Sequence, residues 1–240
     1  MSDTKRVLLK FISPRGIYRY PRLLKPDAGP KGKESKVPKF SVKNEFDPGQ
    51  QFVVGKTKVS QEEIVEKLEA LRDAKFDEVE ADLKAKKKGA ALKKLSKAPV
   101  LRPVLDEDGN ETGKLFITAK TASEYKDKKT GEIVKKRPPT MFDAKGKELK
   151  KLPNVGGGSE GKLSVSADAY YVDSSGEVGV TYYLEATQLL KLVEFGGRSA
   201  ADHGFGEEEG YSGDEDGPAE FDDESASKGE ESTAKAGDDF

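Results

Sequence analysis

Tyrosine and basic side chains alternate in a stretch near the start of the sequence. Tyr18 and Tyr20 flank Arg19, so on a β-strand both rings would share one face and Arg19 would take the other. Further cations beside them are Arg15, Arg22 and Lys25. A surface that holds a single nucleic-acid strand needs cations along the phosphates and aromatic faces on which bases stack. The stretch therefore predicts part of such a surface.

Two more groups of this kind occur in the second half of the chain. The first lies on an expected strand and its turn and consists of Lys120, Tyr125, Lys126, Lys128 and Lys129. The second consists of Lys135, Lys136 and Arg137. A single tyrosine can equally belong to a core, and a single lysine is usually a solvated surface charge. It is the clustering of both kinds that indicates a binding surface.

The sequence offers little for catalysis or metal binding. It has no cysteine and one histidine, His203, which excludes disulfides, thiolate zinc sites and most histidine-based metal sites and triads. The glycines at 156–158 lack the GKS or GKT ending of a phosphate loop, and 106–109 lacks the glycine position and final glutamate of a calcium loop. We expect both to be turns. The chain is therefore expected to be a binding protein and not an enzyme, with no cofactor and no metal.

The net charge of −2 conceals two oppositely charged segments. Residues 206–240 hold 14 acidic and 2 basic side chains, a net charge of −12. The remaining 30 acidic and 40 basic residues give 1–205 a net charge of +10. This asymmetry indicates a basic body that binds a polyanion and an acidic tail that interacts with other groups.

The elements that would carry these residues can be predicted from local patterns. Strands are expected over 6–12, 17–24 and 37–42, with 13–16 as a turn. Ser60 and Glu63 fit a capping box at the start of a helix. Its apolar stripe is expected to be Ile64, Leu68, Leu71, Val79 and Leu83. The helix is expected to end near 86–89, and 90–98 could form a short second helix.

From residue 100 onward the pattern changes to strands. Turns are expected at 106–110, 126–131, 143–146 and 173–176. Several strands with short turns, interrupted by a helical insertion at about 60–97, predict a small barrel over 1–197. Residues 198–240 are rich in Gly, Ser, Ala, Asp and Glu, so we expect a disordered acidic tail. No apolar run approaches the ~18 residues of a membrane span, and the N-terminal residues lack the long apolar core of a signal peptide. A soluble intracellular protein is therefore expected.

Several segments together resemble the single-stranded DNA-binding proteins of T7-type bacteriophages. The resemblance is strongest over 114–197. It is carried in order by TASEYKDKKTGEI, by VGGGS from Val155, by KLSVSADAYY and by LLKLVEFGG. KPDAG from Lys25 and the acidic tail with its final aromatic residue are similar as well, whereas 44–100 matches only as a charged helical insertion.

This resemblance implies a mainly β fold, a five-stranded OB-fold barrel that carries an inserted α-helix. It implies non-specific binding of single-stranded DNA in phage replication, recombination and repair. It also implies that the tail, closed by Asp238, Asp239 and Phe240, contacts the phage DNA polymerase and helicase-primase and competes with DNA for the barrel groove. A homodimer in the cytoplasm of the infected bacterial host would follow.

Individual roles also follow from the resemblance. Lys120 falls on a DNA-contacting lysine of the family, Tyr125 falls on an aromatic position, and Lys5 lies near a basic N-terminal contact. Tyr170 or Tyr171 lies near a further tyrosine contact. A family arginine is replaced here by Ser35, a loss for which either of two neighbours, Lys33 or Lys36, could compensate. The resemblance gives Arg15 no role.

Together, the residue clusters and the resemblance predict a groove that binds phosphates through Lys and Arg and stacks bases on Tyr18, Tyr20, Tyr125 and one of Tyr170 or Tyr171. Two other classes of function stay open at this point. One is a binder of other polyanions, such as structured RNA or duplex DNA. The other is a structural or virion-assembly protein with an acidic tail and no nucleic-acid role.

Overall fold

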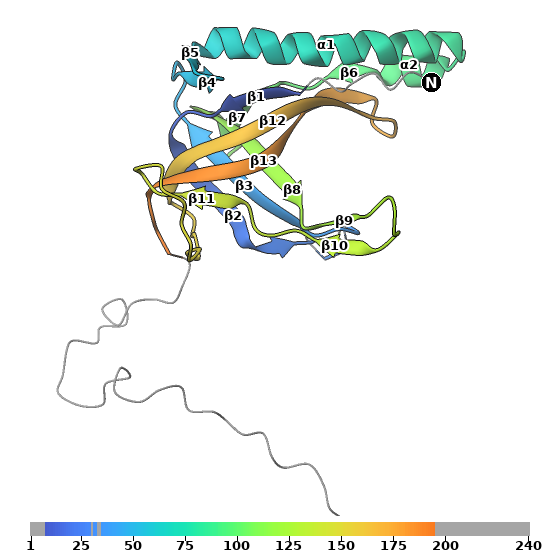
Figure 1. The fold of residues 1–240 in the computed structure, drawn as a ribbon. Coiled ribbons are helices and arrows are strands. Elements are labelled where there is room, and N and C mark those ends of the chain that lie inside the picture. The colour runs from blue at the N-terminus through green and yellow to red at the C-terminus, as the bar shows by residue number, and fades with distance from the viewer. Residues whose placement is uncertain (1–7, 30, 33–34, 195–240) are drawn as a thin grey trace, which may run out of the picture. The chain divides into compact units, whose positions relative to one another are not determined.

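The computed structural model describes residues 8–29, 31–32 and 35–194 (Figure 1). The chain divides into two units, Met1–Gly197 and Arg198–Phe240, and all described residues belong to the first. Five of the predicted site residues lie outside the described ranges: Lys5, Lys33, Asp238, Asp239 and Phe240. The predicted disorder of the tail and the boundary at 197 stay predictions.

Five strands close into a barrel. They are β2 (Gly16–Asp27), β3 (Lys39–Phe46), β8 (Glu111–Ala122), β12 (Glu160–Val172) and β13 (Glu177–Lys191). The hydrogen-bonded order runs β2-β3-β8-β13-β12 and returns from β12 to β2. The β8–β13 pairing is parallel and the other four are antiparallel. This closed Greek-key order confirms the predicted mainly β fold and its OB-fold barrel.

Short strands extend the barrel at its edges. They are β1 (Leu9–Ile12), β4 (Phe52–Val54), β5 (Thr57–Val59), β6 (Ser96–Lys97), β7 (Arg102–Leu105) and β11 (Thr140–Phe142). A separate two-stranded sheet is formed by β9 (Glu124–Lys126) and β10 (Ile133–Lys135), which project beyond β8 (Figure 1). The turns predicted at 106–110, 126–131, 143–146 and 173–176 are confirmed, each with a glycine at positive φ.

Helix α1 (Gln61–Ala85) lies along the β12–β13 hairpin (Figure 1). The hydroxyl of Ser60 accepts from the backbone N–H of Glu63 at 3.2 Å, which confirms the predicted N-cap. The buried face differs from the predicted stripe at one place, because Arg72 is buried while Leu71 is only partly covered. No helix among the described residues is long and apolar enough to cross a membrane.

The second helix is shorter than predicted. Helix α2 covers Gly89–Lys94, and the chain turns extended at Leu95. The reason is a competing partner, since Ser96 and Lys97 add a parallel edge strand to β13. Backbone pairing with the barrel therefore overrides the local helix propensity of the lysine- and alanine-rich segment.

The barrel core is aromatic at one end. Phe11 packs edge-on against Phe52 and Tyr182, with ring centroids 5.7 and 6.0 Å apart. Tyr18 is fully buried, and its hydroxyl reaches the backbone carbonyls of Lys162 and Gln188 at 2.9 and 3.3 Å. The core therefore includes one of the tyrosines that the sequence suggested for base stacking.

Candidate nucleic-acid interface

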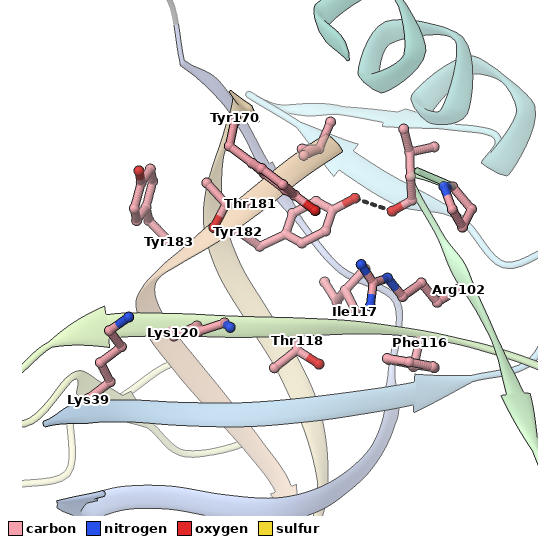
Figure 2. Close-up of a pocket in the computed structure, with 13 residues that line it drawn as sticks. Lys39, Arg102, Phe116, Ile117, Thr118, Lys120, Tyr170, Thr181, Tyr182 and Tyr183 are labelled. Atoms are coloured by element: carbon pink, nitrogen blue, oxygen red, sulfur yellow. Dashed lines mark hydrogen bonds between the residues drawn. The ribbon is translucent and has the colours of Figure 1, made fainter. Parts of the chain in front are cut away.

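A groove of about 500 Å³ crosses the barrel between β3 and β8 on one side and the β12–β13 hairpin on the other (Figure 2). We call it the tyrosine groove. Its lining includes Lys39, Arg102, Phe116, Thr118, Lys120, Tyr170, Tyr182 and Tyr183. In OB-folds this face, with the loops at its ends, is where oligonucleotides bind.

Three cations converge on the tyrosine groove from different elements. Lys39 begins β3, Lys120 lies on β8, and Arg102 begins β7. Among the described residues, no ion pair joins any of the three to a carboxylate. Partial burial, with the charges of Lys39 and Arg102 nearby, lowers the pKa of Lys120. A cation cluster without carboxylate partners creates a positive potential that attracts anions.

Aromatic side chains form the opposite wall of the groove (Figure 2). Tyr183 is 39% exposed and presents an open ring face. Tyr170 is half-buried and donates to Glu177 at 2.6 Å. Tyr182 is buried and donates to the carbonyl of Val100, so it supports the wall from inside. Rings thus stand opposite cations, which is the arrangement that a single strand needs.

The prediction that Tyr18 and Tyr20 share one face is wrong. The pairing of β2 with β3 shifts register between Arg19 and Arg22, and Tyr20 has φ +50°. A bulge of this kind re-aims side chains, so Tyr20 is 79% exposed while Tyr18 is fully buried. Because its ring has no free face, Tyr18 cannot stack on a base, whereas Tyr20 can.

The three predicted arginines of this stretch already have carboxylate partners. Arg15 pairs with Glu160 at 2.6 Å. Arg19 pairs with Glu45 at 2.9 Å and Arg22 with Asp27 at 3.2 Å. The lining of the tyrosine groove does not include them. Their predicted phosphate contacts would require exchange of these partners, and they stay predictions.

Apart from Lys120, both groups predicted in the second half of the chain lie on the β9–β10 arm, residues 124–137, which we call the basic hairpin. Tyr125 is exposed on β9, and the Lys136 ammonium lies 5.7 Å from its ring centroid. The remaining exposed cations of the arm are Lys126, Lys128, Lys129, Lys135 and Arg137. Because β9 follows β8 after Ser123, the arm continues from the end of the groove where Lys39 and Lys120 lie.

Tyr170 lines the tyrosine groove and Tyr171 does not. Both residues line a second groove against α1, where the hydroxyl of Tyr171 donates to Asp173 at 3.3 Å. Of the two predicted alternatives, the geometry favours Tyr170. Lys36 is exposed in the loop between β2 and β3, outside the groove lining.

Sequence reasoning missed Lys39, Arg102 and Tyr183. The parallel pairing of β8 with β13 sets Tyr183 opposite Lys120, and Lys39 pairs with Ala122. These contacts join residues far apart in the chain, so local clustering could not reveal them. One signal was available, because Tyr182-Tyr183 repeats the tyrosine pair of Tyr170-Tyr171.

Comparison with known proteins identifies relatives of this chain. Two curated relatives, the single-stranded DNA-binding proteins of Enterobacteria phage T3 and Escherichia phage T7, are each 33% identical over 88 residues. Each match covers 37% of this chain and spans only 38% of the relative.

The fold has a solved counterpart. The crystal structure of gp2.5, a single-stranded DNA-binding protein encoded by bacteriophage T7, superposes with a TM-score of 0.59 at 21% identity, covering 86% of this chain and 99% of that one. The family model described as single-stranded DNA-binding protein, bacteriophage T7, matches residues 15–192. The chain therefore belongs to the family of single-stranded DNA-binding proteins typified by that of bacteriophage T7.

Proposed function

We propose that this chain binds single-stranded DNA without sequence preference, in the tyrosine groove and along the basic hairpin. The observation that carries the proposal is the convergence of Lys39, Arg102 and Lys120, without a carboxylate partner among the described residues, opposite the open ring of Tyr183. Phosphates would contact the cations while bases stack on the tyrosine wall. Stacking accepts every base, which explains binding without sequence readout.

Binding of this kind depends on salt. Each phosphate contact releases a counterion, so the logarithm of affinity falls with the logarithm of salt by about 0.7 per contact on a single strand. Oligo-dT anisotropy titrations from about 0.05 to about 0.5 M NaCl should therefore give a steep slope. A flat series would contradict the proposal.

Competition experiments separate the other functional classes. Duplex DNA or structured RNA that displaces oligo-dT at equal concentration would indicate a general polyanion binder. Absence of oligo-dT binding at low salt would favour a structural or virion-assembly role. The stacking wall favours the single strand, because paired bases cannot offer their faces to tyrosines.

We further propose that the protein acts in phage replication, recombination and repair in the cytoplasm of the infected host, as a homodimer. The tail would recruit the phage DNA polymerase and helicase-primase, with the ring and carboxylate of Phe240 as the anchor. Phe240→Ala should then abolish co-precipitation of either partner while oligo-dT affinity is retained. Undiminished co-precipitation would remove this role, and light scattering of the full chain tests the dimer.

A further inference from the structure

Arg72 occupies a position on α1 where the pattern calls for an apolar residue. It follows Ile64 and Leu68 at intervals of four on the buried face, and it is only 8% exposed. A buried guanidinium is costly unless its donors are satisfied. The contacts of the Arg72 guanidinium must therefore explain why an arginine occupies this buried position.

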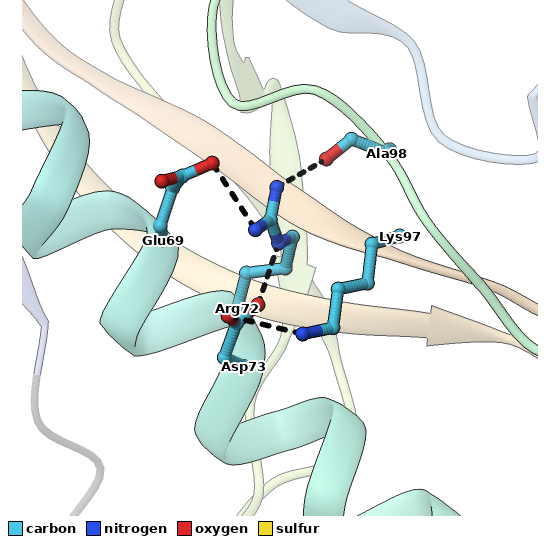
Figure 3. Close-up of polar contacts among 5 residues, drawn as sticks. All are labelled: Glu69, Arg72, Asp73, Lys97 and Ala98. Carbon is cyan, nitrogen blue, oxygen red and sulfur yellow. Dashed lines mark hydrogen bonds and ion pairs between the residues drawn. The ribbon is translucent and has the colours of Figure 1, made fainter.

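All three guanidinium nitrogens have partners (Figure 3). Nη1 donates to the carbonyl of Ala98 at 3.0 Å, Nε to Asp73 at 2.8 Å and Nη2 to Glu69 at 3.2 Å. Asp73 also pairs with Lys97 at 3.0 Å. Helix α1 therefore contacts two consecutive residues, Lys97 through an ion pair and Ala98 through a hydrogen bond.

Those two residues belong to a segment, 96–102, that we call the strap. Its other side is fixed to the hairpin, because Ser96 and Ala98 donate to the carbonyls of Gly176 and Val178 at 3.0 and 2.8 Å. Farther along the strap, the carbonyl of Val100 accepts from the hydroxyl of Tyr182. The strap ends in Arg102, a cation of the tyrosine groove.

We propose that Arg72 is a positioning residue of the tyrosine groove, which it does not itself line. By holding the carbonyl of Ala98, it fixes the strap whose end presents Arg102 to the groove. The inserted helix thereby contributes to DNA affinity through the strap. The inference rests on the proposed function of the groove.

A purely structural role for Arg72 predicts something different. It would lower the free energy of unfolding without altering the affinity of the folded protein. Coupling to Arg102 distinguishes the two roles, because a positioning residue loses its effect once the side chain that it positions is gone.

The test measures oligo-dT affinity against salt for the full chain and for Arg72→Met, Arg102→Ala and the double variant. Methionine keeps an apolar stem, and Glu69 and Asp73 are exposed enough to be solvated without the guanidinium. Arg102→Ala should weaken binding about fivefold near 0.1 M salt and reduce the slope by about 0.7, as expected for one lost contact. Arg72→Met should lose about threefold to fivefold with a similarly reduced slope. The double variant should bind no more weakly than Arg102→Ala alone.

Two further variants serve as a charge control and as an alternative to Arg72→Met. Lys84→Met removes one positive charge from an exposed side chain of the same helix, outside both groove linings, and should leave affinity unchanged. Asp73→Asn loosens the same network by removing the pairs with Arg72 and Lys97, and serves if Arg72→Met does not fold.

The outcomes separate cleanly. If Arg102→Ala weakens binding but the folded Arg72 and Asp73 variants bind normally, the positioning role is wrong. Additive losses in the double variant would also overturn it. If the full chain does not bind oligo-dT, or Arg102→Ala has no effect, the proposed function of the groove fails and the positioning role falls with it.

Discussion

Lys120 combines a proposed binding role with an expected cost to the stability of the fold. Its ammonium lies near Lys39 and Arg102 without a carboxylate partner among the described residues, and its pKa is lowered by partial burial and by these charges. The unfolded chain therefore binds a proton more readily than the folded one between the lowered pKa and the ordinary value of 10.5. Stability should rise with pH through that window.

Lys120→Met should accordingly weaken DNA binding while raising the melting temperature at neutral pH. The affinity of the unsubstituted chain should fall as pH rises through the lowered pKa of Lys120, because the neutral amine loses its phosphate contact. Oligo-dT titration and thermal unfolding check both effects. Lys114→Met, on the same strand but outside the groove lining, is the matched control. A lower melting temperature for Lys120→Met would contradict this account.

Tyr18 and Tyr183 should respond to substitution in opposite ways. Tyr18→Phe leaves the carbonyls of Lys162 and Gln188 without their buried donor. The free energy of unfolding should fall by about 1–3 kcal/mol, measured by urea denaturation, while oligo-dT affinity stays unchanged. Because phenylalanine keeps the ring, this substitution tests the buried hydroxyl alone, and an unchanged free energy of unfolding would contradict its role in the core.

Tyr183→Ala should spare the fold and weaken binding. Its ring is exposed, so its removal opens no core cavity. The loss of one stacked base should cost about 1–3 kcal/mol of binding free energy with little change in salt slope, since no phosphate contact is removed. An unchanged affinity would exclude Tyr183 from the stacking wall.

At the scale of elements, the basic hairpin is expected to extend the groove. Lys128→Glu together with Lys129→Glu reverses two exposed charges at its turn and should weaken binding and reduce the salt slope. The matched control is the pair Lys145→Glu and Lys147→Glu in the turn that follows β11. Equal losses in both double variants would show a general charge effect and no role for the hairpin.

The sequence predicted elements well where the signal was local. Ser60 as an N-cap and the glycine turns depend on residues a few positions apart. The faces of strands were less predictable, since the bulge in β2 depends on pairing with β3 and separates Tyr18 from Tyr20. The groove was only partly predicted, because Tyr183 meets Lys120 through a pairing of distant strands.

At the scale of the whole molecule, the opposite net charges of the two segments predict that the tail affects DNA binding. Residues 206–240 carry a net charge of −12 and the rest +10, so the tail is expected to compete with DNA for the cations of the body. Truncation after residue 205 should tighten oligo-dT binding at low salt, and the difference should vanish at high salt.

A full-length variant with the tail carboxylates changed to amides keeps the chain length and isolates the effect of charge. It should bind as tightly as the truncated chain. Equal or weaker affinity of the truncated chain relative to the full chain would count against competition by the tail.

The single parallel pairing of the barrel has a mechanical consequence. β8 and β13 are joined by only two register pairs, Ala119 with Tyr182 and Lys120 with Tyr183, and this seam borders the tyrosine groove. A DNA strand that contacts Lys120 on β8 and stacks on Tyr183 on β13 would bridge this pairing. The occupied protein should then resist separation of β8 from β13, which predicts slower hydrogen exchange in these two strands when DNA is bound.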